Sequence, residues 1–262
     1  MRQIGVFLMA AMSTAQASAR IVTQSVDYHH GGVALVGYLA YDDAVKEKRP
    51  GVLVVHEWWG LNDFPRQKAR ELAELGYVAL AADMYGQGVA TDNPEQAGKL
   101  AGQFRSDPKL WRERAKAAYD ALARQERVDP TKIAAIGFCF GGSTVMQLAA
   151  SGADLAGIVS FHGGLMPIGA DDAARNKAKW LILHGAADTT MPAESVQEFQ
   201  DSLRKTSIDW QMVIYAGAKH GFTNSAADKL GMDAVGYSKI AAERSWRQMR
   251  SFFDEVLGPF RP

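Results

Sequence analysis

The most informative part of the chain reads Ile133-Ala134-Ala135-Ile136-Gly137-Phe138-Cys139-Phe140-Gly141-Gly142. Its apolar beginning predicts a buried strand, and residues 143–150 predict a helix, so Cys139 lies in the turn between them. Gly137 and Gly141 are needed because a side chain would collide with the backbone where it doubles back. The positive end of the helix dipole points at the sulfur, which favours a thiolate over a thiol.

Cys139 is the only cysteine among 262 residues, so the chain can form no internal disulfide and no cysteine-based zinc cluster. A lone cysteine is often an inert, buried side chain. The strand-turn-helix context favours the other interpretation, in which Cys139 is a nucleophile presented at the end of a sheet.

Composition excludes several classes of protein. Hydrophobic residues make up 47% of the chain and charged residues 22%, with 29 basic and 29 acidic side chains. So apolar a chain can bury enough surface to fold, which excludes a mainly disordered protein. The zero net charge argues against a nucleic-acid partner. No stretch reaches the roughly 18 apolar residues of a transmembrane helix, so no membrane partner is expected.

The first 19 residues predict a secretory signal peptide. Arg2 is followed by an apolar run, Ile4 to Met12, and then by small-x-small cleavage patterns that end at Ala19. We therefore expect a periplasmic or secreted protein. The alternative is a cytoplasmic protein in which this segment is a buried first strand or a ragged translated start.

Residues 20–262 predict a single α/β domain, a mostly parallel sheet of about eight strands with helices on both faces. Strands are expected at 21–28, 33–41, 51–55, 77–82, 133–136, 155–161, 180–184 and 210–215. Helices are expected after Asn62 or Asp63 up to Gly76, twice within 94–127 on either side of Pro108, at 143–150, around Val196 to Leu203, and around Met249 to Val256.

Two loops after late strands could supply partners for the thiolate. A nucleophile on this kind of turn is followed along the chain by an acid and then by a histidine, each after a strand. Asp188 follows the strand at 180–184, and His220 follows the strand at 210–215. Among the other histidines, His162 is expected at the pocket rim and His184 in a structural role. No histidine pair has metal-ligand spacing, so no metal site is predicted.

The buried strand at 51–55 runs into His56-Glu57-Trp58-Trp59-Gly60. This is the loop that donates one oxyanion-hole amide in such enzymes, so the amides of Trp58 and Phe140 are the predicted donors. Glu57 lies beside two tryptophans that would remove water from it. Its charge would oppose a free thiolate and favour a shared proton, which predicts a role at the site rather than an exposed loop position.

With these residues in view, the chain resembles the dienelactone hydrolase family of α/β-hydrolases from about Asp43 to Leu257. The resemblance is carried by Val54-Val55-His56-Glu57-Trp58-Trp59-Gly60, Ala82-Asp83-Met84-Tyr85-Gly86, Gly137 to Gly142, Gly185-Ala-Ala-Asp188 and Lys219-His220-Gly221-Phe222. It implies cleavage of esters or lactones without a cofactor, by a triad of Cys139 as nucleophile, His220 as base and Asp188 as orienting acid. It also implies that Glu57 pairs with the resting cysteine.

The chain departs from this family where two arginines would hold a substrate carboxylate. Gln87 and Asn224 stand at those positions, which argues against tight selection of a carboxylated lactone. Arg66, Arg105 and Lys219 are the cations that could substitute. The tryptophans point to an apolar or aromatic substrate group. The predicted pocket comprises Trp59, Tyr85, Gln87, Phe222 and Asn224.

The sequence thus predicts a cofactor-independent carboxylic-ester or lactone hydrolase that forms an acyl intermediate on Cys139. Its partner is a small-molecule substrate, and the protein is expected to be a monomer or a small homo-oligomer. Three alternatives remain: an acyltransferase with the same triad, a non-catalytic small-molecule-binding protein, and a redox protein with a reactive thiol.

Overall fold

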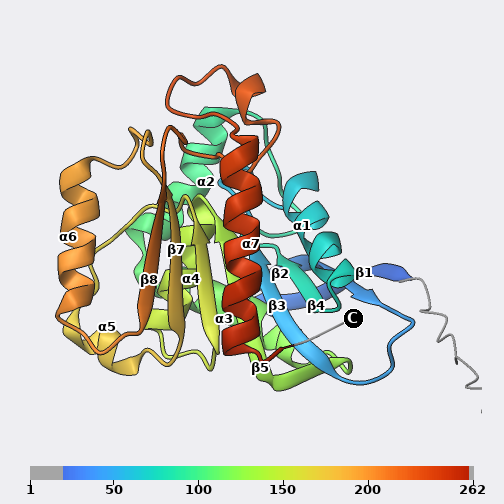
Figure 1. The fold of residues 1–262 in the computed structure, drawn as a ribbon. Helices are drawn as coiled ribbons and strands as arrows, with labels where there is room; N and C mark the ends of the chain where they lie inside the picture. The colour runs from blue at the N-terminus through green and yellow to red at the C-terminus, as the bar shows by residue number, and fades with distance from the viewer. Residues whose placement is uncertain (1–19, 260–262) are drawn as a thin grey trace, which may run out of the picture.

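The computed structural model describes residues 20–259, and the predicted signal peptide lies outside this range. The described chain forms an eight-stranded sheet of order β1-β2-β4-β3-β5-β6-β7-β8 (Figure 1). The strands are β1 (Ile21–His30), β2 (Val33–Asp42), β3 (Arg49–Val55), β4 (Val78–Ala82), β5 (Val128–Phe138), β6 (Gly157–Phe161), β7 (Lys179–Gly185) and β8 (Trp210–Tyr215).

The sheet is mostly parallel, as the sequence predicts. Strands β3 to β8 run parallel to one another. The hairpin of β1 and β2 adds an antiparallel edge, because β2 pairs antiparallel with β4. The carboxyl ends of the parallel strands therefore meet at one edge of the sheet, where α/β proteins place their ligand sites.

Eight helical segments within residues 20–259 connect and cover the strands. They are α1 (Asp63–Glu74), α2 (Pro94–Ser106), α3 (Pro108–Ala123), α4 (Phe140–Ala150), α5 (Ala170–Arg175), α6 (Ala193–Arg204), the 3-10 helix η1 (Ala227–Leu230) and α7 (Lys239–Val256). Asn62 precedes helix α1 as its N-cap, and its side chain accepts a hydrogen bond from the amide of Phe64. Asp107 caps α3 in the same way, with Pro108 in the first turn.

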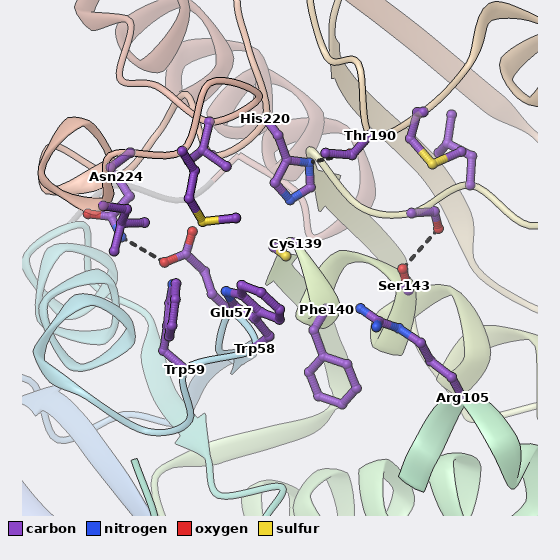
Figure 2. A pocket seen from close by; sticks show the side chains of 18 of the residues that line it. Glu57, Trp58, Trp59, Arg105, Cys139, Phe140, Ser143, Thr190, His220 and Asn224 are labelled. Atoms are coloured by element: carbon purple, nitrogen blue, oxygen red, sulfur yellow. Dashed lines mark hydrogen bonds between the residues drawn. The ribbon is translucent and has the colours of Figure 1, made fainter. Parts of the chain in front are cut away.

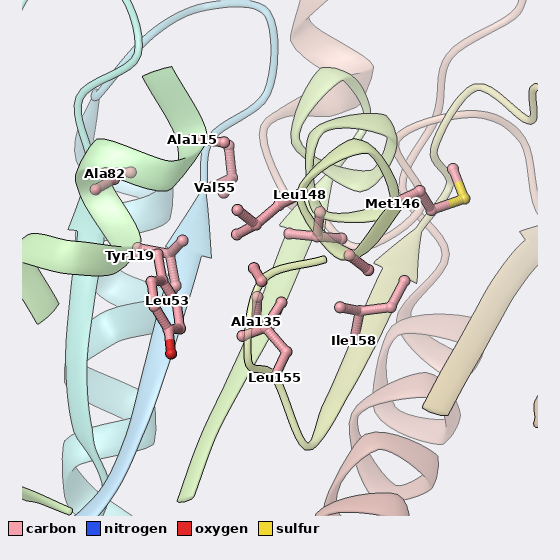
Figure 3. Close-up of a cluster of buried hydrophobic side chains, with 14 of the residues drawn as sticks. Leu53, Val55, Ala82, Ala115, Tyr119, Ala135, Met146, Leu148, Leu155 and Ile158 are labelled. Carbon is pink, nitrogen blue, oxygen red and sulfur yellow. The ribbon is translucent and has the colours of Figure 1, made fainter. Parts of the chain in front are cut away.

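Successive side chains of the central strands alternate between two apolar cores. Leu53 and Val55 of β3 face the core beneath α2, α3, α4 and α6, whereas Val52 and Val54 face the core beneath α1 and α7. Figure 3 shows part of the first core, in which side chains of α3 and α4 pack on the middle of the sheet. Burial on both faces explains why these strands read as continuous apolar runs.

Two features of the fold differ from the sequence prediction. Strand β5 begins at Val128 rather than Ile133, because Val128 and Asp129 pair with Arg49 and Pro50 before a register shift at Pro50 and Gly51. The short segments α5 and η1 have no expected counterpart, since neither is long enough to show a helical period.

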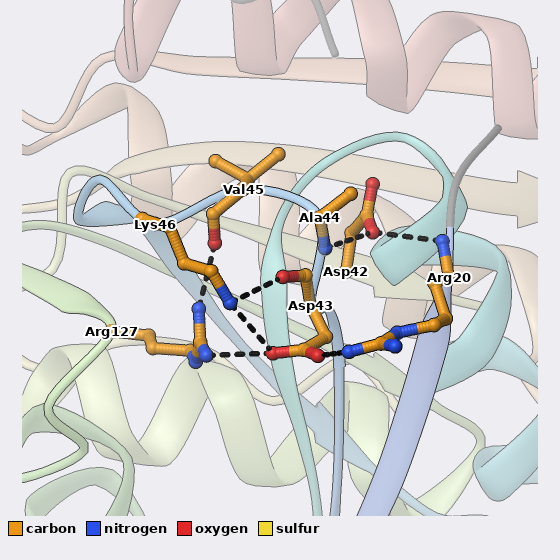
Figure 4. Close-up of polar contacts among 7 residues, drawn as sticks. All are labelled: Arg20, Asp42, Asp43, Ala44, Val45, Lys46 and Arg127. Carbon is orange, nitrogen blue, oxygen red and sulfur yellow. Dashed lines mark hydrogen bonds and ion pairs between the residues drawn. The ribbon is translucent and has the colours of Figure 1, made fainter. Parts of the chain in front are cut away.

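Asp43, in the loop between β2 and β3, joins three distant parts of the chain (Figure 4). Its carboxylate pairs with Arg20, which precedes β1, and with Arg127, which precedes β5, at 2.8 Å. Arg127 also donates to the carbonyl of Val45 at 2.7 Å. These contacts lie at the end of the sheet opposite the strand carboxyl ends, so they stabilise the scaffold rather than the site. No helix within residues 20–259 combines the length and hydrophobicity needed to cross a membrane.

Candidate active site

Cys139 lies between β5 and α4 in a backbone conformation that side chains rarely adopt. Its φ is +54° and its ψ is −114°. A Cβ at Gly137 would overlap the backbone of Gly141, and a Cβ at Gly141 would overlap the carbonyl of Val55. The two glycines are therefore required by close backbone approach, as the sequence predicts. A non-glycine residue at positive φ at the start of a helix is a frequent sign of a functional site.

The backbone of Cys139 is held from both sides. Its amide donates to the carbonyl of Phe161 at 3.0 Å and to Nδ1 of His162 at 3.2 Å. Its carbonyl accepts the amide of Gly142 at 3.0 Å. These bonds fix the strained turn, and they leave the Cys139 side chain partly exposed at the floor of a cavity.

His220 and Asp188 form a hydrogen-bonded pair beside Cys139. Nδ1 of His220 lies 2.8 Å from Oδ2 of Asp188, whose carboxylate is fully buried. Thr190 orients that carboxylate, because its hydroxyl and its amide donate to Oδ1 at 2.6 and 2.9 Å. In Figure 2 the ring of His220 lies above the sulfur of Cys139. The three side chains thus come together in the order expected for nucleophile, base and orienting acid.

The protonation of this pair follows from its surroundings. Burial alone would lower the pKa of His220, but the Cys139 sulfur and the Asp188 carboxylate raise it well above its ordinary value. Burial would raise the pKa of Asp188, but the hydrogen bond and charge of His220 and the Thr190 donors hold it below its usual range. Both neighbours therefore favour the charged form of the His220 ring.

Glu57 lies at the end of β3 with only 6% of its surface exposed. The side-chain amide of Asn224 donates to Oε2 of Glu57 at 2.7 Å. Burial raises the pKa of Glu57 to about 7, although the Asn224 hydrogen bond and the charge of His220 act in the opposite direction. Figure 2 shows the carboxyl group on the other side of Cys139 from Arg105. Glu57 thus borders the cavity with a carboxyl group that gains and loses its proton near neutral pH.

The amides of Trp58 and Phe140 are placed at the same edge of the sheet. Trp58 follows β3, and Phe140 is the first residue of α4. Neither amide donates to a protein acceptor among residues 20–259. Two free donors beside Cys139 are what an oxyanion site requires.

A cavity of about 400 Å³ opens above these groups. Glu57, Trp58, Trp59, Cys139, Phe140, His220 and Asn224 all line it. The remaining walls are largely apolar and include Trp111, Leu165, Met166, Met191, Leu230, Met232 and Val235. The cavity is the size of a small-molecule site, and its apolar walls fit an aliphatic or aromatic substrate group.

Three of the predicted pocket residues do not line this cavity. Tyr85 is buried below the loop, where its hydroxyl donates to the carbonyl of Trp58 at 2.9 Å. Phe222 is fully buried and packs edge-on against His162. Gln87 is exposed, and its backbone amide donates to the backbone carbonyl of Ala34 in β2, away from the cavity. The prediction placed these residues by their position in a motif, whereas the backbone turns their side chains elsewhere.

His162 also differs from its predicted place at the pocket rim. It is fully buried, and its Nε2 lies 2.8 Å from the hydroxyl of Thr223. Burial and the nearby His220 lower the pKa of His162 well below its ordinary value. The neutral ring therefore connects the turn of Cys139 to the loop of His220.

Arg105, of the three cations considered from the sequence, is the one that lines the cavity. It is exposed on α2, and Figure 2 shows its guanidinium beside Phe140 and Ser143. Thr190 also lines the cavity, and the sequence did not predict it. A polar residue between Asp188 and Pro192 reads as ordinary loop sequence, so nothing but the fold identifies it. Among the described residues, no three His, Cys, Asp or Glu side chains are grouped to hold a metal ion.

Comparison with known proteins assigns the chain to a class. The sheet, the turn at Cys139 and the order of the site residues are those of an α/β-hydrolase. The model of the dienelactone hydrolase family matches residues 35–257, and the chain belongs to that family. It is therefore a hydrolase of the carboxylic ester or lactone type.

Three relatives illustrate the range of similarity. "Protein usf" of Aquifex pyrophilus is 30% identical over 239 residues, which cover 89% of this chain and 99% of the relative. The crystal structure of a dienelactone hydrolase-like promiscuous phosphotriesterase from metagenomic libraries has a TM-score of 0.88 and 40% identity, covering 91% of this chain and 99% of its own. A structure named m3DLH has a TM-score of 0.88 and 43% identity, and the match covers 90% of this chain and 99% of that one.

Proposed function

We propose that the protein hydrolyses carboxylic esters or lactones through an acyl-enzyme on Cys139. The observation that carries the proposal is the position of Cys139 at positive φ on the floor of a cavity that His220 also lines. Nδ1 of His220 lies 2.8 Å from Oδ2 of Asp188, so the histidine is oriented for proton transfer through its second ring nitrogen, Nε2.

In the first half of the reaction, the Cys139 thiolate attacks the carbonyl carbon of the substrate. The negative oxygen that develops accepts hydrogen bonds from the free amides of Trp58 and Phe140. The carbon–oxygen bond to the leaving alcohol then breaks, and the His220 imidazolium gives its Nε2 proton to the departing oxygen. In a lactone this alcohol stays attached to the acyl group.

In the second half, water attacks the thioester while His220 accepts a proton from it. The carbon–sulfur bond breaks, and the acid and the thiolate are released. Asp188 stays ionised throughout and stabilises the imidazolium. Glu57 opposes a standing negative charge on the sulfur when it is ionised, so it would restrain the thiol in the absence of substrate.

The test is turnover of a nitrophenyl ester by the wild type and by Cys139→Ala. We expect the variant to lose at least about a thousandfold in kcat/KM, as expected when a nucleophile is removed. Ser143→Ala is the matched control, because Ser143 lines the same cavity but its hydroxyl is bonded to the carbonyl of Gly164 at 2.9 Å. Ester cleavage that survives Cys139→Ala would exclude the mechanism.

The same assay separates the alternatives. An acyltransferase would divert the acyl group to an added alcohol. A binding protein would show no turnover with any member of an ester and lactone panel. A redox protein would react rapidly with alkylating agents and peroxide without hydrolysing esters. The panel includes cis- and trans-dienelactone, and we expect uncharged aromatic esters to be the better substrates.

Phosphotriester cleavage is a second candidate activity. The relative described as a promiscuous phosphotriesterase shares 40% identity over 91% of this chain. An uncharged, tetrahedral triester could present its phosphoryl oxygen to the same two amides. Release of nitrophenol from a nitrophenyl phosphotriester, lost in Cys139→Ala, is the expected outcome for this activity.

A further inference from the structure

His56 lies directly beneath the loop that carries the proposed oxyanion amide. It is fully buried at the end of β3 and does not line the cavity. Its Nδ1 lies 2.5 Å from the carbonyl oxygen of Glu57. Its Nε2 accepts the amide of Met84 at 3.3 Å. Both ring nitrogens are thus engaged with backbone groups.

These two contacts determine the tautomer of the ring. A backbone amide can only donate, so Nε2 must be the unprotonated nitrogen. Nδ1 then carries the proton and donates it to the carbonyl of Glu57. Burial lowers the pKa of His56 to about 4, which keeps the ring neutral near neutral pH.

The carbonyl of Glu57 belongs to the same peptide group as the amide of Trp58. Because the peptide is planar, a hydrogen bond at its oxygen also fixes the direction of its N–H. It also polarises the group, since hydrogen bonds in series strengthen one another. A donor at the Glu57 carbonyl therefore makes the Trp58 amide a better-aimed and stronger donor.

Aromatic contacts hold the ring in this position. Tyr85 packs edge-on against His56 at 4.8 Å between ring centroids, and its hydroxyl donates to the carbonyl of Trp58. Phe140, the other proposed oxyanion residue, stacks on His56 at 5.9 Å. One buried ring thus contacts both sides of the proposed oxyanion site.

We propose that His56 is a positioning residue, which orients and polarises the Glu57–Trp58 peptide through its Nδ1–H so that the Trp58 amide stabilises the oxyanion. The proposal rests on the proposed function. It is distinct from the proposed hydrolytic triad, because His56 does not line the cavity that Cys139 lines.

The experiment compares His56→Asn with His56→Gln. The amide nitrogen of asparagine can occupy the place of Nδ1 and keep the donor to Glu57. Glutamine reaches the place of Nε2 and keeps the acceptor for Met84 alone. Both substitutions are polar and similar in size, and each keeps one of the two hydrogen bonds of His56 while it removes the other.

We expect His56→Gln to lower kcat for a nitrophenyl ester by about 10- to 100-fold at little change in KM, and His56→Asn to stay within about threefold of the wild type. The second readout is alkylation of Cys139 by iodoacetamide, a displacement that forms no oxyanion. Its rate should be the same in all three proteins. Equal kcat in the two variants, or a parallel fall in alkylation, would overturn the proposal.

The wild type provides a measurement that does not depend on a variant folding. Nitrogen-15 spectra of the histidine rings should show one buried imidazole protonated at Nδ1 that disappears in His56→Asn. A proton on Nε2 would overturn the assignment. Ester turnover that persists in Cys139→Ala would instead contradict the proposed function, so the two failures are distinguishable.

Discussion

The strained turn at Cys139 has a cost and a visible compensation. A non-glycine residue in such a conformation costs about 1–3 kcal/mol. Three hydrogen bonds hold the turn in place. The amide of Cys139 donates to Phe161 and to His162, and its carbonyl accepts from the amide of Gly142. The strain lifts the sulfur into the cavity and leaves the Phe140 amide free, which connects the local conformation to the proposed chemistry.

Arg105 supports a prediction about selectivity. It is the one arginine or lysine that lines the cavity among the described residues. Because its guanidinium is exposed, it should contribute modestly. We expect Arg105→Gln to raise KM about two- to fivefold for an ester that carries a carboxylate, with no change for an uncharged ester of the same size.

Lys99→Gln is the matched control for this prediction. Lys99 is also on α2 and is exposed, but it pairs with Glu95 at 2.7 Å outside the cavity. The substitution removes the same net charge. Steady-state kinetics at low and high salt complete the test, since an exposed ion pair weakens as salt rises. An equal effect of the two variants would mean that Arg105 acts only through net charge.

Sequence patterns predicted the positions of the candidate catalytic residues better than the walls of the cavity. Residue type and chain order were sufficient to predict that Cys139, Asp188 and His220 lie together, because the fold brings the carboxyl ends of its parallel strands to one edge. Side-chain direction in a loop depends on local dihedral angles that carry no periodicity. Tyr85 and Phe222 therefore belonged to the right motifs but point away from the cavity.

At the scale of elements, the hydrophobic periodicity of the sequence predicted the strands and the long helices. It did not predict the segment after His220 that forms one wall of the cavity. Leu230, Met232 and Val235 line the cavity from η1 and the irregular chain after it. A few apolar residues in so short a segment show no periodicity, so the sequence pattern is that of an ordinary loop. Their role depends on contacts across the sheet edge, which the sequence does not display.

The junction of β5 and α4 allows a prediction about stability. A Cβ at Gly141 would overlap the carbonyl of Val55, and backbone cannot move away cheaply at the centre of the sheet. We expect Gly141→Ala to lower the free energy of unfolding by about 3 kcal/mol or more, as overpacking in a rigid core does. Urea denaturation monitored by circular dichroism provides the measurement.

Gly98→Ala is the control, with the opposite sign. Gly98 lies within α2, and nothing approaches a Cβ there within 4 Å. Alanine should stabilise the protein by about 0.5–1 kcal/mol, because it loses less entropy than glycine in a helix. Equal stability of the two variants would show that the turn tolerates a side chain and is not fixed by backbone approach.

At the scale of the whole molecule, Glu57 makes stability depend on pH. Burial raises its pKa to about 7, from an ordinary value of 4.5. The folded protein therefore holds this proton more tightly than the unfolded chain. The stabilisation that this proton provides is complete below about pH 4.5 and is lost as the pH rises to about 7. The loss lowers the free energy of unfolding by about 3 kcal/mol.

Glu57→Gln should remove this dependence. Glutamine keeps an oxygen that accepts from Asn224, so the variant resembles the protonated wild type. We expect its free energy of unfolding to exceed that of the wild type by less than about 1 kcal/mol at pH 5 and by up to about 3 kcal/mol at pH 8. Urea denaturation at both pH values provides the measurement, with Glu198→Gln at an exposed position of α6 as the control.

The outcome bears on why a hydrolase would keep a buried carboxyl group here. If Glu57→Gln is more stable at pH 8 but hydrolyses esters more slowly, the wild type keeps the Glu57 carboxylate for its effect on Cys139 and loses stability because of it. A constant difference between pH 5 and pH 8 would mean that folding does not raise the pKa of Glu57.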